Sequence, residues 1–86
     1  MRHLASQGFW EAYDALPLSI RNLADENFEL LKASPRHPSL HYKRIGHYRS
    51  VRVGRQYRAL AVEVPDGILW FWIGTHPEYD KLLASR

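Results

Sequence analysis

The chain contains no cysteine, which excludes disulfide bonds and thiolate metal sites as sources of its stability. No apolar run approaches the roughly 18 residues of a membrane-spanning helix, and the opening residues lack the apolar centre of a signal peptide. We therefore expect a cytoplasmic protein with no membrane partner. Its 86 residues, 45% of them hydrophobic, suit a single folded domain over residues 1–86.

Acidic residues are missing from a long central stretch of the sequence. Between Leu30 and Val62 there is no Asp or Glu, yet this stretch holds eight of the twelve Lys and Arg residues and three of the five His residues. The remainder carries four basic and nine acidic residues, so the net charge of +3 originates in one region. Such a region suits a polyanion or an acidic protein segment. A solvated basic face is the alternative.

The apolar pattern predicts two helices followed by a sheet. Residues 7–16 and the segment that begins at Pro17 repeat large apolar side chains at helical spacing, and Ser6 is a candidate cap for the first helix. Prolines in "SPRHPS" end the second helix. Four later segments have the pattern of strands: 40–45, 47–53, 56–64 and 68–73. Residues 2–5 are a candidate for a further short strand. We expect an α+β fold in which an N-terminal helical hairpin packs on a three- to four-stranded antiparallel sheet, with a short C-terminal helix.

Strand register places one arginine near the C-terminal helix. If Gly54 and Arg55 form a two-residue turn, Val51 pairs with Arg58. If residues 65–67 form a three-residue loop, Arg58 then lies opposite Gly74, and a glycine there leaves space above the arginine. We therefore expect Arg58 at the end of the sheet from which the last helix departs.

The stretch "GTHPEY" at residues 74–79 joins the last strand to the last helix. Thr75 and Glu78 have the spacing of a capping box, in which the two residues bond reciprocally at a helix start. His76 then lies in the first helical turn, where the helix dipole favours a neutral imidazole and attracts a phosphate. Tyr79, one turn on, is compatible with a role in a site or with packing in the core.

RNA cleavage without a metal requires a base for the ribose 2′-OH, a cation beside the phosphate and an acid for the leaving oxygen. Arginine or lysine beside histidine or tyrosine supplies these roles, and Arg58, His76 and Tyr79 are predicted to lie together. The sequence offers no good metal-binding set: His37 and His41 are four residues apart, but Pro38 prevents them from sharing a helical face. It also contains no glycine-rich loop of the kind that binds phosphates. We expect neither a metal nor another cofactor.

Three stretches in this order resemble the RelE/ParE toxin superfamily of bacterial type II toxin–antitoxin systems: "HPSLHYKRIG", "YRSVRVGRQYRALAV" and "WFWIGTHPEYDKLL". The last is most similar to the RelE and HigB branches. The resemblance implies a toxin that cleaves mRNA in the ribosomal A site without a metal, leaving a 2′,3′-cyclic phosphate. It also implies a cognate antitoxin, encoded by a neighbouring gene, that wraps the basic surface.

The resemblance assigns roles to individual residues. Arg58 matches the arginine that contacts the scissile phosphate in RelE-like enzymes, and Tyr79 matches a C-terminal tyrosine. His76 lies where some relatives carry arginine or histidine, and His41 resembles a histidine of HigB-like members. RelE has lysines on the strand where this chain has arginines, and arginine is a poor proton acceptor, which moves the base role to His41 or His76. The expected RNA-binding residues are Lys43, Arg44, Arg49, Arg52 and Arg55.

Two other functions fit the same features. A ParE-like inhibitor of DNA gyrase would share the fold and bind a protein without chemistry of its own. A non-catalytic basic module that binds RNA or an acidic peptide would share the charge. Fold alone does not separate these functions.

Overall fold

The computed structural model describes residues 2–84 of the chain. In chain order, these residues form the strand β1 (Arg2–Ala5), the helices α1 (Gln7–Asp14) and α2 (Leu18–Ala33), the 3₁₀ turn η1 (Pro38–Leu40), the strands β2 (Lys43–Ile45), β3 (Tyr48–Val53), β4 (Tyr57–Val64) and β5 (Gly67–Thr75), and the helix α3 (His76–Ala84). No helix among these residues has the length and apolar character needed to cross a membrane.

The strands form one mixed sheet in the order β1-β5-β4-β3-β2. Strands β2 to β5 form an antiparallel meander, whereas β1 pairs in parallel with β5. The predicted α+β fold with its helical hairpin and short C-terminal helix is confirmed. The sheet is larger than the three or four strands expected, because the segment at residues 2–5 docks on the edge of β5. The backbone N–H of Ser6 extends this pairing by donating to the carbonyl of Trp70 at 2.9 Å.

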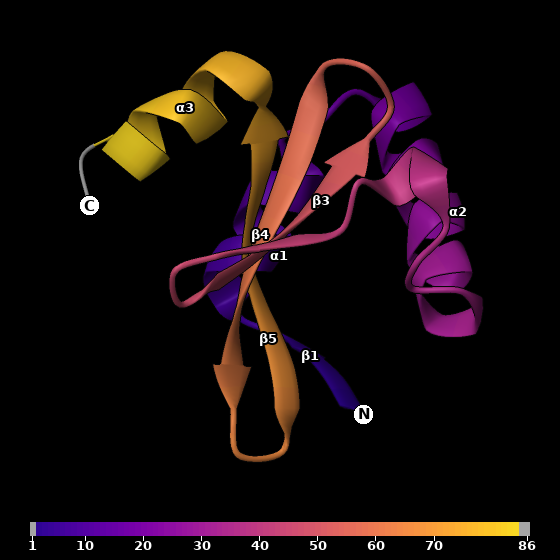
Figure 1. Cartoon of the computed structure of the whole chain (residues 1–86). Helices are drawn as coiled ribbons and strands as arrows, with labels where there is room; N and C mark the ends of the chain where they lie inside the picture. Colours follow the sequence, from indigo (N-terminus) through magenta and orange to yellow (C-terminus); the bar gives the residue numbers. More distant parts are fainter. Residues whose placement is uncertain (1, 85–86) are drawn as a thin grey trace.

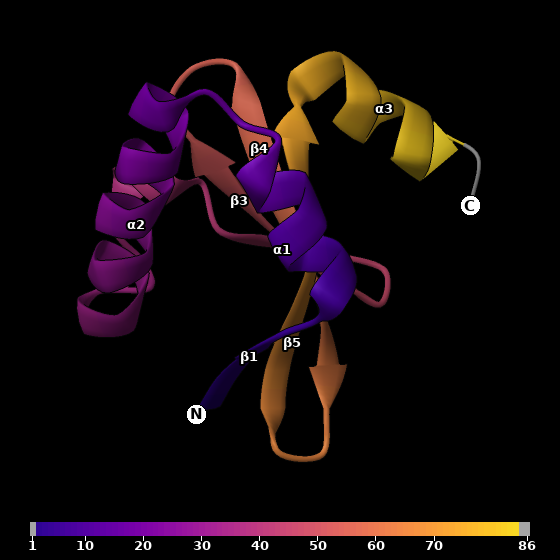
Figure 2. The ribbon, with the colours of Figure 1, turned by 180° about the vertical axis from the view of Figure 1, so that it is seen from behind.

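Helices α1 and α2 cover one face of the sheet, which is the near face in Figure 2. Helix α3 leaves the end of β5 and extends away from the other two helices (Figure 1). The core lies between the sheet and α1 and α2. Its buried side chains come from alternate strand positions and from the segments packed on them: Leu16, Leu31, Leu40, Val51, Val53, Ala59, Ala61, Ile68, Trp70 and Ile73. The other strand positions therefore point to the opposite face.

Local sequence accounts for most element boundaries. Ser6 caps α1 as expected, since its Oγ accepts from the backbone N–H of Phe9 at 3.1 Å. The strand expected at residues 40–45 begins only at Lys43. Before it, Pro38 opens the 3₁₀ turn, for which its fixed φ is suited, and His37 caps that turn through its Nδ1. His41 follows in the left-handed conformation, with φ of 46°, and redirects the chain into β2.

Gly67 tests the docking of the edge strand. Its φ is 150°, and a Cβ there would lie 2.1 Å from the carbonyl oxygen of Arg2, a backbone atom that cannot move without displacing β1. Gly67→Ala should therefore lower the free energy of unfolding by ~2 kcal/mol or more. Chemical denaturation measures this change.

Gly8→Ala is the matched control. A Cβ at this helical position meets only ordinary contacts at 3.7 Å, so the variant should match or exceed wild-type stability by up to ~1 kcal/mol. Equal behaviour of the two variants would show that β1 does not constrain Gly67.

Candidate functional site

Arg52 and Arg58 lie directly opposite each other on β3 and β4. The core contains Val51 and Val53, which flank Arg52, and Ala59, which follows Arg58, so both arginines point to the opposite face. The prediction of a two-residue turn at Gly54 and Arg55 is wrong. The turn comprises residues 54–56, and this extra residue places Arg58 against Arg52 instead of Val51. Among the ion pairs of residues 2–84, none involves either arginine.

The expected pairing of Arg58 with Gly74 is confirmed, although one assumption behind it is wrong. The β4–β5 turn contains two residues, Pro65 and Asp66, instead of three. An irregularity between Leu60 and Ala61 shifts the register by one residue and compensates for the shorter turn.

The predicted open space above Gly74 is not present. A Cβ at Gly74 would lie 2.5 Å from the ring of Trp72 and 3.0 Å from the carboxylate of Glu78. The glycine therefore accommodates the indole of its own strand and the helix cap. It does not provide room for a ligand.

His41 lies beside Arg52. Its exposed ring places Nε2 3.3 Å from Nη1 of Arg52, and the guanidinium also donates from Nε to the carbonyl of Gly54 at 2.8 Å. Because arginine only donates, Nε2 of His41 is the acceptor in this contact. We call Lys43, Arg52, Arg58 and His41 the cationic stripe. Lys43 belongs to it because it pairs with Ser50, which points to the same face as Arg52.

Tyr79 is buried beneath the stripe, with 4% of its surface exposed. Its hydroxyl accepts from Ser50 Oγ at 3.1 Å, and Ser50 is fully buried. The guanidinium carbon of Arg58 lies 5.7 Å from the centre of the Tyr79 ring, in range of a cation–π contact. Nη1 of Arg58 is shielded from solvent and has no hydrogen-bond partner within residues 2–84. Tyr79 is thus buried on the face of the sheet opposite α1 and α2, where it supports the arginine.

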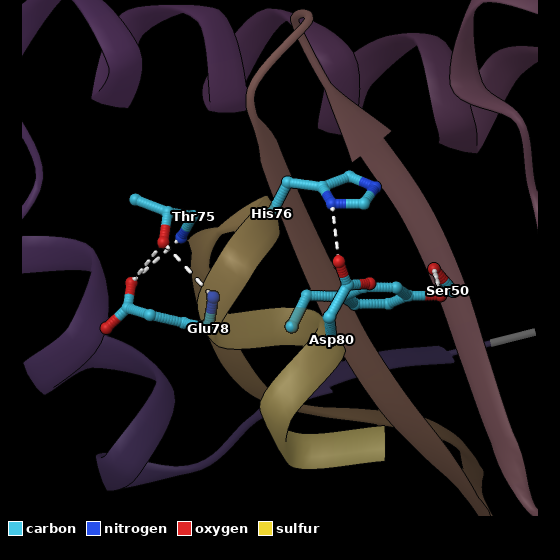
Figure 3. A network of polar contacts seen from close by, with 6 residues as sticks. Ser50, Thr75, His76, Glu78 and Asp80 are labelled. Carbon is cyan, nitrogen blue, oxygen red and sulfur yellow. Dashed lines mark hydrogen bonds and ion pairs between the residues drawn. The ribbon is translucent and has the colours of Figure 1, made fainter. Parts of the chain in front are cut away.

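His76 opens helix α3 and faces Asp80 one turn later. Its Nδ1 lies 3.1 Å from the Asp80 carboxylate, and 43% of its side chain is exposed. Figure 3 marks this contact with a dashed line. A carboxylate accepts hydrogen bonds, so Nδ1 carries the proton in this pairing and Nε2 is left as the basic nitrogen. The centres of the His76 and Tyr79 rings are 5.7 Å apart. Arg58 and His76 are therefore neighbours of the same buried ring.

The predicted capping box fixes how α3 leaves the sheet. The Glu78 carboxylate accepts from the backbone N–H of Thr75 at 3.0 Å and from its hydroxyl at 2.8 Å, and Thr75 Oγ1 accepts from the N–H of Glu78 at 3.4 Å (Figure 3). These bonds from Thr75 lower the pKa of Glu78. The N–H of His76 also donates to the carbonyl of Gln56 at 2.8 Å, which ties the helix start to the β3–β4 turn.

Two further predicted RNA-binding residues, Arg44 and Arg49, lie apart from the stripe. Arg49 has the register of the core-facing positions, and its guanidinium is paired with the Glu63 carboxylate. Arg44 pairs with Arg49 in register and donates to the carbonyl of Gly46. Arg55 is exposed in the turn. Arg44 and Arg49 are close to Arg52 in the sequence, but the alternation of side chains along the strands points them to the other face.

Comparison with known families and structures identifies the fold. The family model of the ParE-like toxin domain matches residues 18–81. The chain belongs to this toxin family. A comparison with curated protein sequences found no match.

Solved structures resemble the toxin at the level of the fold. A chain of the RelB–RelE antitoxin–toxin complex from Methanococcus jannaschii is 23% identical with a TM-score of 0.70, covering 91% of this chain and 96% of that one. The YoeB/ParE toxin from Agrobacterium tumefaciens is 12% identical with a TM-score of 0.67, covering 88% and 99%. The isolated RelE toxin of E. coli is 10% identical with a TM-score of 0.62, covering 96% and 95%.

Two contact residues of the toxin were not identified from the sequence. Asp80 is four residues after His76, and this spacing places both on one helical face, so the contact could have been found. Ser50 gave no such signal, because its bond to Tyr79 joins residues that are far apart in sequence. Within residues 2–84, no group of three or more His, Cys, Asp or Glu is arranged to hold a metal ion.

The bond between Ser50 and Tyr79 can be measured by a double-mutant cycle. Tyr79→Phe and Ser50→Ala each leave a buried hydroxyl without its partner and should each lower the free energy of unfolding by ~1–2 kcal/mol. The double variant should cost less than the sum, with a coupling of about 1 kcal/mol. Strictly additive losses in denaturant titrations would contradict the bond.

The capping box predicts a pH-dependent stability. Because the Glu78 pKa is lowered in the folded toxin, its contribution is complete above the ordinary value of 4.5 and is lost as the pH falls through the folded-state pKa. Thr75→Ala should lower the unfolding free energy by ~1 kcal/mol at pH 7 and by less at pH 3. A loss that does not shrink at the lower pH would exclude this role for the carboxylate.

Proposed function

We propose that this chain, as a single domain, is the toxin of a type II toxin–antitoxin system and cleaves mRNA on the ribosome without a metal, by attack of a ribose 2′-OH. The observation that carries the proposal is the pair of opposed arginines, which take part in no ion pair of residues 2–84. His41 contacts Arg52, and His76 lies beside the Tyr79 ring that supports Arg58. A phosphodiester supplies the negative charge that this pair lacks. The RelE/HigB-like branch of the superfamily is part of the proposal.

The arginines take the electrostatic role in this mechanism. Arg58 and Arg52 remain charged and stabilise the charge that grows on the phosphorus oxygens as the 2′-oxygen attacks. The orphaned Nη1 of Arg58 gains an acceptor when the guanidinium turns toward the phosphate. Tyr79 positions Arg58 through its ring, while its hydroxyl is engaged with Ser50.

His76 is the proposed base. The Asp80 carboxylate orients the imidazole and leaves Nε2 as the nitrogen that accepts the 2′-OH proton, a relation that histidine bases elsewhere share with an orienting carboxylate. His41 is the rival, but its Nε2 already accepts from Arg52. In this arrangement the histidine that is not the base is the candidate acid for the leaving 5′-oxygen.

The proposed partners follow from the same charge distribution. The stripe and its surroundings attract the mRNA and ribosomal RNA through their phosphates. A solved relative is a RelB–RelE antitoxin–toxin complex, which supports an antitoxin as the inhibitory partner of this toxin. Such an antitoxin would be encoded by a neighbouring gene and would act in the cytoplasm.

Inhibition of DNA gyrase is the second candidate, because the matching family model is the ParE-like toxin domain. The order of events in cells separates the two functions. Expression without an antitoxin should reduce the uptake of labelled amino acids before DNA synthesis falls. If plasmid supercoiling is lost first, the toxin acts on gyrase and the proposed cleavage is wrong.

Substitutions on programmed ribosomes test the assigned roles. Arg58→Ala should slow mRNA cleavage about a hundredfold, equivalent to ~3 kcal/mol, because charge stabilisation is lost in the transition state. Arg2→Ala removes the same charge from an exposed position in β1 and should leave the cleavage rate unchanged. Equal rates for the two variants would remove Arg58 from the mechanism.

The histidines are compared in the same cleavage assay. His76→Ala should slow cleavage a hundredfold or more if it is the base, and Asp80→Asn should slow it by a smaller factor because the ring loses its orienting partner. Tyr79→Phe should retain activity, since its ring still supports Arg58. Full activity of His76→Ala together with inactivity of His41→Ala would transfer the base role to His41.

A further inference from the structure

A second basic surface lies at the other side of the edge strand β2. A groove of about 870 Å³ is bounded by the end of α2, the η1 turn and the strands β2 and β3. The chain passes from α2 through η1 to β2 (Figure 1), and residues of all three segments line the groove. We call it the basic groove after the cations that line it: Lys32, Arg36, Lys43, Arg44 and Arg49.

No acidic side chain lines the basic groove within the described part of the chain. Lys32 and Arg49 are compensated by nearby glutamates, at Glu29 and Glu63. Arg36, Lys43 and Arg44 take part in no ion pair of residues 2–84. The groove therefore holds a surplus of positive charge that residues 2–84 do not compensate.

Aromatic rings also line the basic groove. The half-buried Tyr42 and the imidazoles of His3, His37 and His41 line the same groove. Proteins bind single-stranded nucleic acids with surfaces that carry both rings and cations, because bases stack on the rings while phosphates contact the cations. An acidic peptide would use the cations and leave the rings without a role. The lining thus favours a single strand of RNA.

The basic groove is continuous with the cationic stripe. His41 lines the groove and contacts Arg52 of the stripe. Lys43 lines the groove and pairs in register with Ser50, on the side of the stripe. An RNA strand held at Arg58 can therefore pass over β2 and enter the groove while it stays on positively charged surface.

We propose that the basic groove binds a second segment of the RNA strand whose scissile phosphate lies at the stripe. This inference rests on the proposed function and extends it, since it makes affinity depend on RNA length. A short oligonucleotide occupies the stripe alone. A longer one also fills the groove and binds more tightly because further phosphates and bases are engaged.

Fluorescence anisotropy with uncleavable 2′-O-methyl RNA of about 4 and about 12 nucleotides tests the proposal, these lengths spanning the site sizes usual for single-strand binders. Arg36→Ala/Arg44→Ala should weaken binding of the longer RNA about tenfold and leave the shorter one within twofold. For this double variant and the longer RNA, the slope of log affinity against log salt concentration should be smaller by about 1.4, because two phosphate contacts are lost. Arg2→Ala/Lys81→Ala is the charge-matched control outside the groove lining and should keep the wild-type ratio of the two affinities.

Equal weakening of both RNAs, or the same loss in the control, would overturn the groove assignment. A second contradicting result is a polyglutamate peptide that needs Arg36 and Arg44 for binding when the longer RNA does not. The groove would then suit an acidic protein segment. Length-dependent binding that needs the groove, found together with a cleavage-competent Arg58→Ala, would support the groove and reject the proposed role of the stripe. Failure of the wild type to bind either RNA would reject both.

Discussion

The like-charge pair of Arg52 and Arg58 is the constraint on which the site depends. Side chains directly opposite on neighbouring strands lie close together, and two cations in that position destabilise a sheet by up to about 1 kcal/mol. The opposite face offsets this cost, because the paired residues Val51 and Ala59 are buried under the helices. The core thus holds the two guanidinium groups opposite each other, and neither takes part in an ion pair of residues 2–84.

Tyr79 connects this pair to the last helix. It anchors α3 on the sheet through Ser50, lies under the guanidinium of Arg58 and contacts the ring of His76. The cap of α3 and the bond from His76 N–H to Gln56 fix the direction in which the helix leaves β5. A cation and a histidine on different elements are therefore placed by packing and backbone bonds, which is how a site without a metal can be preorganised.

Patterns with a local cause could be predicted from the sequence. The caps at Ser6 and at Thr75 and Glu78 were predicted correctly, because a cap depends on residues within one turn. The parallel docking of β1 was not, since four residues carry too little pattern to specify a partner strand. The pairing of Arg58 with Gly74 was correct only because a bulge offset a turn that is one residue shorter than assumed.

The candidate site was predictable in part for the same reason. Arg58 and His76 depend on register and on a helix start, both of which leave traces in sequence. The separation of Arg49 from Arg52 follows from strand alternation, yet it required knowing that Val51 and Val53 face the core. The contact of His41 with Arg52 depends on a left-handed residue after η1, and nothing near His41 in the sequence indicates that conformation.

Nitrogen-15 NMR of the arginine side chains tests most directly whether the opposed arginines bind a phosphodiester. An uncleavable 2′-O-methyl dinucleotide is titrated into the labelled toxin while the Nε–H resonances of Arg52, Arg58 and Arg49 are followed. The Arg52 and Arg58 resonances should shift together and saturate at one ligand per chain, while Arg49, paired with Glu63 on the other face, stays in place. A shift of Arg49 with Arg58 unmoved would contradict the account.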